Sequence, residues 1–316
     1  TDDDAAGRAS GRQGGVSTGR ARAPGEAQAR PASRLNPVMQ FSVGEFAPVA
    51  DGVHVAVAEP AGVNIGLVVG ESGCLVVDTG SSPEQGAEIR RAAEKVAGVP
   101  VVGVLVTHWH YDHLFGLAAF TDVPSYAHET VPAWLGRPEC REAASGLGVE
   151  VSALTAPTHT LSLAKVIDVG GRRVEVVHFG RGHTDGDLVA IVPDASLIFS
   201  GDLLESAGPP SFGDDCHLRE WPSAVDGILG LVAEQTVLVP GHGDPMDRLA
   251  AFTQRAEISG LYGQAEYLVA QGVRVEDAYE AGEWPFDEVT VRGVLPLLYA
   301  QLAAEGKIPR THLPLA

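Results

Sequence analysis

The chain has 316 residues, of which 45% are hydrophobic, and a formal net charge of −19 at pH 7. Such a chain can bury one large core, while its acidic balance repels phosphate backbones and excludes a nucleic-acid partner from our expectations. No stretch approaches the roughly 20 apolar residues of a membrane helix, so no membrane partner is expected. The three cysteines, Cys74, Cys140 and Cys216, do not form a disulfide framework. This favours a reducing compartment, and we expect a cytoplasmic location.

The first segment, residues 1–36, has no aromatic residue and is rich in Gly, Ala, Ser and Arg. It cannot bury enough apolar area to offset the entropy of ordering, so we expect a disordered tail. No continuous apolar run follows a basic start, which argues against an intact secretory signal. A single folded domain is expected over residues 37–316.

The first predicted elements are three short β-branched strands over residues 53–57, 65–69 and 74–77, separated by glycine-containing turns. The periodicity then changes to that of a helix. Ser82 suits the N-cap, Pro83 the first helical position, Gln85 a capping box, and Gly98 the end of the helix. A strand over 101–106 follows, and this strand–helix–strand order predicts a parallel crossover.

Two hairpins come next, over 166–169 with 174–177 and over 188–192 with 197–199. A helix is predicted from Pro222 to about Ala233, then a strand over 237–239, and a helical extension over about 246–316. Two rounds of strands followed by helices indicate two αβ halves packed face to face. The apolar face of the extension predicts packing against these halves or against another subunit, so a homodimer is one expectation.

The stretch "THWHYDH" places His108, His110, Asp112 and His113 at the end of a predicted strand. Backbone alternation turns His108 and His110 the same way, whereas Asp112 and His113 point into neighbouring space. Imidazole nitrogens and carboxylate oxygens are good zinc ligands. A site for two ions needs about six to eight protein ligands, so further ligands are expected elsewhere.

Three further candidates each follow an apolar strand. They are His183 in "GRGHTDGD", Asp202 in "LIFSGD" and His242 in "VLVPGHGDP". Flanking glycines allow the backbone to turn sharply and to approach an ion closely. Because strand ends that converge on one rim are where α/β folds build sites, we expect these residues to meet the histidine-rich stretch.

In this order, "VVDTG", "THWHYDH", "GHTDGD", "SGD" and "PGHG" resemble the motifs of the metallo-β-lactamase superfamily of metallohydrolases. The resemblance spans residues 53–243 and implies an α/β fold, a four-layer αββα sandwich with two mixed sheets and outer helices. It implies that His108, His110 and His183 bind one metal, that Asp112, His113 and His242 bind a second, and that Asp202 bridges them. Asp78 resembles the carboxylate that orients a ligand imidazole without binding metal.

The resemblance implies two Zn²⁺ ions per chain, with Fe or Mn as alternatives. Two such ions lower the pKa of a shared water, giving hydroxide at neutral pH as the nucleophile. Asp112 is expected to orient that water and to relay its proton. The predicted reaction is hydrolysis of an ester, thioester, lactone or amide bond of a small molecule.

Several alternatives remain open from the sequence. Established metallo-β-lactamases typically carry Cys or Ser where this chain has Asp202, which favours the thioesterase and lactonase branches, although β-lactam cleavage stays an alternative. A persulfide dioxygenase with a single iron could use His108, His183 and Asp202. A flavodiiron oxidoreductase is disfavoured because it would carry Glu where this chain has His110. The acidic balance argues against a nuclease. The intact ligand set argues against a non-catalytic binding module.

The remaining histidines are expected to be structural or solvated. His54 and His178 lie in strand-like runs, His128 and His159 in connecting segments, and His312 near the C-terminus. Cys216 and His217 lie in a Gly/Pro-rich loop after Asp202, where this superfamily shapes its substrate pocket. His217 is therefore a candidate substrate contact, whereas Cys216 is expected to be a free thiol rather than a nucleophile.

Overall fold

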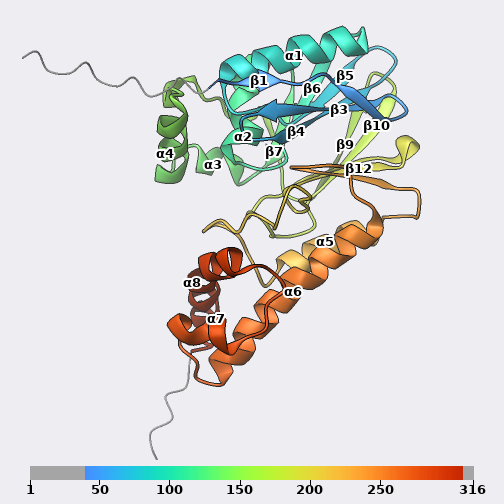
Figure 1. Ribbon diagram of the computed structural model, residues 1–316. Coiled ribbons are helices and arrows are strands. Elements are labelled where there is room, and N and C mark those ends of the chain that lie inside the picture. The colour runs from blue at the N-terminus through green and yellow to red at the C-terminus, as the bar shows by residue number, and fades with distance from the viewer. Residues whose placement is uncertain (1–39, 309–316) are drawn as a thin grey trace, which may run out of the picture. The chain divides into compact units, whose positions relative to one another are not determined.

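The computed structural model describes residues 40–308, all within the compact unit Met39–Ala316. The expected tail over 1–36 and His312 lie outside the described residues. The domain is built from two sheets, with helices on the outer face of each (Figure 1). The predicted four-layer αββα architecture with two mixed sheets is confirmed.

The first sheet has eight strands in the order β1-β3-β4-β5-β6-β7-β8, with β2 also paired to β3. They are β1 (Ser42–Val43), β2 (Ala47–Ala50), β3 (Val53–Glu59), β4 (Val63–Val69), β5 (Cys74–Val77), β6 (Val101–Leu105), β7 (Ser125–His128) and β8 (His159–Leu161). The pairs from β5 through β8 are parallel, as the predicted crossover requires. His128 and His159 lie in β7 and β8, so their placement in connecting segments was wrong. These strands have only four and three residues, too few to show alternation.

The second sheet has five strands in the order β13-β12-β11-β10-β9. They are β9 (Ala164–Val169), β10 (Arg172–Val177), β11 (Val189–Val192), β12 (Leu197–Gly201) and β13 (Val237–Pro240). Both predicted hairpins are confirmed, since β9 pairs antiparallel with β10 and β11 with β12. Strand β13 pairs parallel with β12, which makes this sheet mixed as well.

The α-helices are α1 (Pro83–Ala97), α2 (Tyr111–Leu114), α3 (Val131–Trp134), α4 (Pro138–Leu147), α5 (Trp221–Leu229), α6 (Arg248–Ala270), α7 (Ala278–Ala281) and α8 (Glu288–Ala304). Short 3₁₀ helices are η1 (Phe115–Phe120), η2 (Val151–Ala153), η3 (Pro193–Ala195) and η4 (Val275–Asp277). The helix expected over 222–233 is shorter than predicted. It ends at Leu229, and Gly230 is its C-cap residue. Within residues 40–308, no helix combines the length and apolar character that crossing a bilayer requires.

Helix α1 forms as its local sequence predicts. The Gln85 amide donates to the Ser82 side chain at 3.1 Å, and the Gln85 side chain accepts the Ser81 amide at 2.7 Å. The first bond satisfies an N–H group that the first helical turn leaves without a partner, and the second satisfies the N–H of the residue before the N-cap. Gly98 ends the helix at φ 68°, a left-handed conformation that glycine adopts without strain.

Apolar side chains form three layers because successive residues of a strand point to opposite faces of a sheet. In β5, Leu75 and Val77 enter the core between the sheets, while Cys74 and Val76 face the core under α1. In β12, Phe199 faces the central core and Ile198 faces the helices of the other outer layer. Figure 1 shows α1 and α6 on opposite outer faces of the paired sheets.

Candidate metal centre

The seven predicted metal ligands lie beyond the ends of four strands, where the two sheets meet. His108, His110, Asp112 and His113 follow β6 and run into α2. His183 lies between β10 and β11, Asp202 directly follows β12, and His242 follows β13. The fold brings all seven into two neighbouring donor groups.

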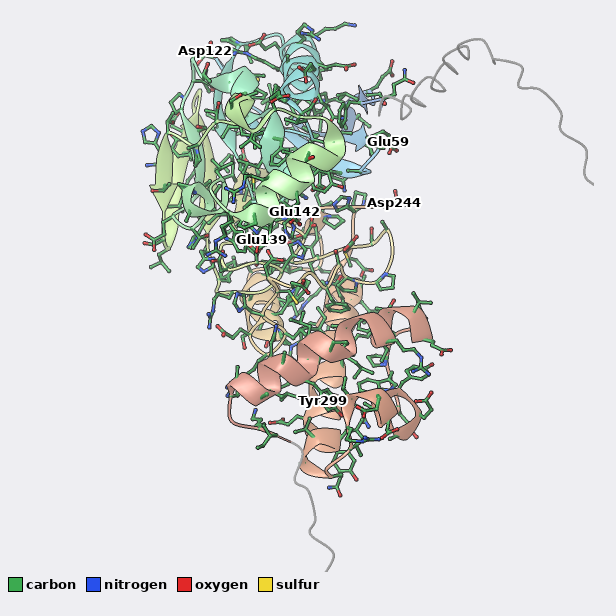
Figure 2. All side chains as sticks on the ribbon, turned by 90° about the vertical axis from the view of Figure 1, so that its left-hand side faces the viewer. Glu59, Asp122, Glu139, Glu142, Asp244 and Tyr299 are labelled. Atoms are coloured by element: carbon green, nitrogen blue, oxygen red, sulfur yellow. The ribbon has the colours of Figure 1, made fainter. Side chains whose placement is uncertain are left out.

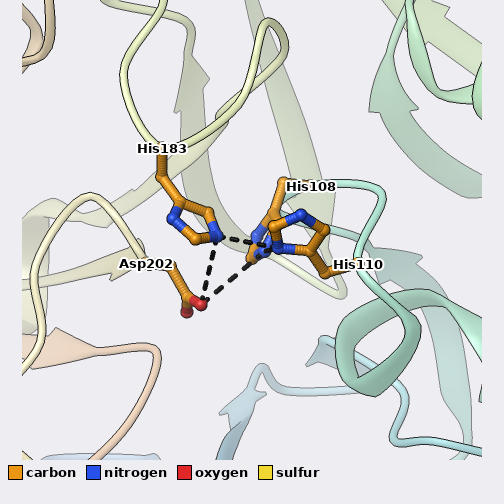
Figure 3. A group of neighbouring side chains, drawn as sticks. All are labelled: His108, His110, His183 and Asp202. Atoms are coloured by element: carbon orange, nitrogen blue, oxygen red, sulfur yellow. Dashed lines mark hydrogen bonds and ion pairs between the residues drawn. The ribbon is translucent and has the colours of Figure 1, made fainter. Parts of the chain in front are cut away.

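The first group, called here the three-histidine group, contains His108, His110 and His183, with Asp202 beside it (Figure 3). The Nδ1 atom of His110 lies 2.8 Å from His183 Nε2 and 3.1 Å from His108 Nε2. The Asp202 Oδ2 atom lies 3.4 Å from His183 Nε2 and 3.8 Å from His108 Nε2. Ligand atoms around a tetrahedral zinc ion stand about 3.3 Å apart, so these four donors fit such an ion.

The second group contains Asp112, His113 and His242. His242 Nε2 lies 3.2 Å from Asp112 Oδ2, and His113 Nε2 lies 3.7 Å from the same oxygen. Asp202 faces this group too, since its Oδ1 lies 3.2 Å from His113 Nε2. Both of those atoms are buried without a hydrogen-bond partner. Because buried polar atoms are normally satisfied, this pair fits a site for a cation.

Asp78 orients a histidine in each group. Its Oδ2 atom lies 2.8 Å from His113 Nδ1, and it accepts the hydroxyl of Thr107 at 2.9 Å. That hydroxyl in turn lies 3.0 Å from His108 Nδ1. Asp78 itself has φ 66°, a left-handed conformation that is uncommon for a non-glycine residue. The arrangement directs the Nε2 atoms of both imidazoles towards the donor groups.

The other two members of the three-histidine group also have outer partners. His183 Nδ1 lies 3.2 Å from the carbonyl oxygen of Ser211. His110 Nε2 lies 3.2 Å from Asp215 Oδ2, which also accepts the indole N–H of Trp109 at 2.7 Å. In each imidazole one nitrogen is therefore held by the protein, and the other faces the group.

Burial dominates the ionisation of two histidines in the first group. It holds the pKa of His108 well below the ordinary value and lowers the pKa of His183 to about 4. Neighbouring histidines act in the same direction, whereas Asp202 opposes the shift. Both imidazoles are therefore neutral at pH 7, the form that binds metal ions.

Charge dominates in the second group. Burial favours the neutral imidazole, but Asp202, Asp78 and Asp112 more than offset it and hold the pKa of His113 well above its usual range. The carboxylates of Asp112 and Asp202, 3.2 and 3.6 Å from His242 Nε2, likewise outweigh burial and raise the pKa of His242 to about 10. Burial works to raise the pKa of Asp202, yet the surrounding histidines hold it well below the ordinary value. In the absence of metal, protonated imidazoles therefore balance the carboxylates here.

The loop that carries His242 is fixed from the opposite sheet. Asn64 of β4 donates its side-chain amide to the carbonyl oxygens of Pro240 at 3.0 Å and Gly243 at 2.7 Å. Gly241 packs so closely on Asp202 that a Cβ atom there would lie 1.7 Å from the Asp202 Oδ1 atom. Only glycine allows the backbone to come this close to the Asp202 side chain.

A pocket of about 900 Å³ borders the three-histidine group at His110. Cys216 and His217, the residues of the predicted substrate loop, both line it. The Cys216 side chain is nevertheless buried, and burial raises the pKa of its thiol, so it is not activated as a nucleophile. Burial also lowers the pKa of His217.

Two aspartates near His183 have partners outside the donor groups: Asp187 caps its own loop, whereas Asp185 bonds to a side chain of α3. Asp187 accepts the Thr184 amide at 3.0 Å and its hydroxyl at 2.7 Å, and burial raises the pKa of Asp187 to about 7. Asp185 accepts the indole N–H of Trp134 at 2.9 Å. Neither residue belongs to the donor groups among the described residues.

Sequence reasoning missed Thr107, Asn64 and Asp215. Thr107 directly precedes His108, and Asp215 lies in the "FGDD" stretch of the predicted substrate loop, so both stood beside residues already singled out. Asn64 carries no such signal, because its partners are about 180 residues away, at separations of 176 and 179. These residues contact the ligands or their neighbouring backbone and do not belong to the donor groups themselves.

Comparisons with known proteins agree with this geometry. The family model described as "Metallo-beta-lactamase superfamily" matches residues 58–249. A metallo-beta-lactamase type 2 from Bacillus cereus is 27% identical over 186 residues, covering 58% of this chain and 68% of that protein. An acyl-coenzyme A thioesterase from Bos taurus is 28% identical over 203 residues, covering 57% of this chain and 72% of that protein. The solved structure of a metallo-beta-lactamase from Pontibacter korlensis has a TM-score of 0.56 at 22% identity, covering 70% of this chain and 99% of that one, which shows the shared fold.

Proposed function

The chain belongs to the metallo-beta-lactamase superfamily of metal-dependent hydrolases, and on that premise we propose that it hydrolyses an ester, thioester, lactone or amide of a small molecule with two Zn²⁺ ions. The observation that carries this proposal is the pair of donor groups, which share Asp202 between them. In this proposal His108, His110 and His183 hold one ion, and Asp112, His113 and His242 hold the other.

Bound divalent ions would supply Lewis-acid polarisation of the substrate and an activated water at neutral pH. The chain supplies the rest. Asp112 is buried beside His242, with its oxygen 3.2 Å from His242 Nε2, and histidine charge outweighs burial to lower the pKa of Asp112. It is therefore a carboxylate at pH 7, able to accept a proton from water and to return it to a leaving group.

The pocket beside His110 is the proposed site for the part of the substrate that does not react. Its volume of about 900 Å³ lies within the range of small-molecule sites. Trp109 and Trp134 form part of its wall and stack with ring centroids 4.3 Å apart and planes 2° apart. His217 also lines this pocket and is a candidate substrate contact.

Bond preference follows from Asp202. A carboxylate at this position resembles the thioesterase and lactonase branches of the superfamily, and the similarity to an acyl-coenzyme A thioesterase supports this choice. The similarity to a type 2 metallo-beta-lactamase supports β-lactam hydrolysis as the second candidate. We propose that oxygen esters, lactones or thioesters are cleaved faster than β-lactams.

The test combines metal content by mass spectrometry with activity against matched lactones, thioesters and β-lactams. Two zinc ions per chain and zinc-dependent cleavage of an ester or thioester are expected. Faster cleavage of β-lactams would overturn the bond preference. One iron per chain, with oxygen consumed in the presence of a persulfide, would replace the hydrolase by the dioxygenase alternative.

Two further expectations remain predictions. A homodimer would cover apolar surface of the C-terminal helices, where Leu249 and Phe252 of α6 are exposed. Sedimentation analysis of the full chain tests it. The cytoplasmic location expected from cysteine usage is tested by fractionation of the source cells.

A further inference from the structure

A short loop segment, residues 213–218, is held by the C-terminal helix α8. The side-chain amide of Gln301 donates to the carbonyl oxygen of Cys216 at 2.6 Å, and its oxygen accepts the amide N–H of Leu218 at 3.2 Å. One side chain therefore satisfies two backbone groups, as a neighbouring strand would. Figure 2 shows α8, marked by Tyr299, in the helical part of the chain, and Glu139 of α4 among the sandwich residues. The pocket of about 900 Å³ is lined by Glu139, Gln301 and Asp215 together.

The same segment is tied to the three-histidine group at two places. The His217 amide donates to the carbonyl oxygen of Gly182 at 2.8 Å, directly before His183. Asp215 Oδ2 accepts the indole N–H of Trp109 at 2.7 Å and lies 3.2 Å from His110 Nε2. Stacking on Trp134 holds the Trp109 indole in place, so the carboxylate has a fixed position next to the imidazole.

We propose that Asp215 is a positioning residue for the three-histidine group, and that Gln301 of α8 sets the position of Asp215. This inference rests on the proposed function, in which His110 would help to hold a metal ion; its Nδ1 atom is the one that faces His108 and His183. A carboxylate beside Nε2 favours the tautomer with its proton on Nε2, which leaves the Nδ1 lone pair directed at His108 and His183. Gln301 lies beyond the family match at residues 58–249, so α8 adds a contact to this loop that the matched region does not contain.

The chain offers a matched control in Asp214. It has the same charge, lies next to Asp215 in the same loop and lines the same pocket, but it is exposed and makes no side-chain hydrogen bond or ion pair among the described residues. D214N therefore changes the net charge of the pocket as D215N does, without touching His110. A difference between the two variants separates the contacts of Asp215 with His110 and Trp109 from the effect of the loop's charge.

The first experiment measures zinc affinity of the full chain by competition with a chelator, together with the visible spectrum of the Co²⁺-substituted protein. D215A is expected to weaken binding in the three-histidine group by about 10- to 100-fold and to shift its Co²⁺ spectrum. D215N, which keeps an acceptor oxygen, is expected to lose less, and D214N to match the wild type. Wild-type affinity and spectrum in D215A would overturn the proposal.

A double-mutant cycle tests the role of α8. Q301A is expected to weaken binding in the same group by less than D215A, and the D215A/Q301A variant to bind no more weakly than D215A alone, because Gln301 acts through Asp215. Additive losses would overturn that link. Circular dichroism and thermal unfolding of each variant identify any general loss of fold, and D215N keeps the test valid if D215A does not fold.

A readout without metal separates this inference from the proposed function. In the chelator-stripped protein, ¹⁵N NMR shifts of His110 report its tautomer, which is expected to carry the proton on Nε2 in the wild type and in D214N, and to become mixed in D215A. If the wild type binds no metal but shows this change, the proposed function fails and the positioning role stands. If the wild type binds metal but the tautomer does not respond to D215A, the positioning role fails and the proposed function stands.

Discussion

The two donor groups contain similar residues but acquire their ionisation in different ways. His108 and His183 of the three-histidine group are kept neutral mainly by burial. In the second group, carboxylates outweigh burial and favour protonated His113 and His242. His108 and His183 are therefore ready to bind an ion at neutral pH, whereas His113 and His242 must first release protons.

The difference shows that histidine count alone does not describe a metal site. The partners of the second nitrogen and the nearby carboxylates decide whether an imidazole is an available ligand. Asp202 connects the groups, since its two oxygens lie 3.2 Å from His113 Nε2 and 3.4 Å from His183 Nε2. The following predictions test whether the groups are as distinct as their geometry indicates.

The largest effect is expected from Asp202→Ala, because this residue faces both groups. Binding of each ion should weaken by at least about 100-fold, because loss of a residue that merely supports a ligand already costs up to about 100-fold in affinity. Hydrolysis should fall in parallel. Metal content by mass spectrometry and turnover of a model ester are the measurements. His159→Ala, at an exposed histidine outside both groups, is the control. An Asp202→Ala protein that keeps both ions would refute the shared position of this carboxylate.

Single-ligand variants should divide the two groups. His110→Ala is expected to lose the ion of the three-histidine group, and Asp112→Ala the ion of the second group, so that each variant retains about one ion per chain and little activity. Stoichiometry from mass spectrometry and the Co²⁺ spectra of both variants test this. Full metal content with normal turnover in either variant would show that the assignment to two ions is wrong.

Metal affinity should depend on pH more steeply in the second group. The pKa of His242 is about 10 and that of His113 is raised, so both carry protons at pH 7 that a metal must displace. Affinity for this group should therefore rise with pH, by up to about 10-fold per pH unit for each proton, and level off near pH 10. His108 and His183, with lowered pKa values, release none at pH 7.

Zinc titrations between about pH 6 and 9, with proton release followed in weak buffer, measure this difference. Asp112→Ala serves as the comparison, because it retains only the three-histidine group. Equal pH slopes in the wild type and in this variant would contradict the electrostatic contrast between the groups.

The smallest effect is expected from Asn64→Ala. The change leaves the carbonyl oxygens of Pro240 and Gly243 without their side-chain donor, which costs about 1–3 kcal/mol of stability. Because these residues lie next to His242, the zinc affinity of the second group should fall, while the zinc affinity of the three-histidine group should stay unchanged. Denaturant unfolding and zinc competition measure both. Equal weakening of the two groups would show that Asn64 supports the fold only.

Local patterns explain which elements the sequence predicted well. Helix α1 has its cap, its first-turn proline and its terminal glycine within the segment itself, so nothing distant is needed to place it. Strands β7 and β8 have too few residues to show alternation and depend on pairing with β6 and with each other. The end of α5 was also placed imprecisely, at about Ala233 instead of Leu229, because a local sequence pattern locates a helix end less well than it locates the helix itself.

By itself the sequence determined the two rounds of strands and helices, and the seven donor residues that follow their strands, because strand ends and ligand spacing are local properties of the chain. Only the tertiary structure decided which nitrogen faces the donor groups, and which residue holds the other nitrogen, in His108, His110, His113 and His183. Trp109 and Asp215 are 106 residues apart, and Gln301 and Cys216 are 85 apart. Contacts of this kind arise from how sheets and helices pack, and no short stretch of sequence encodes them.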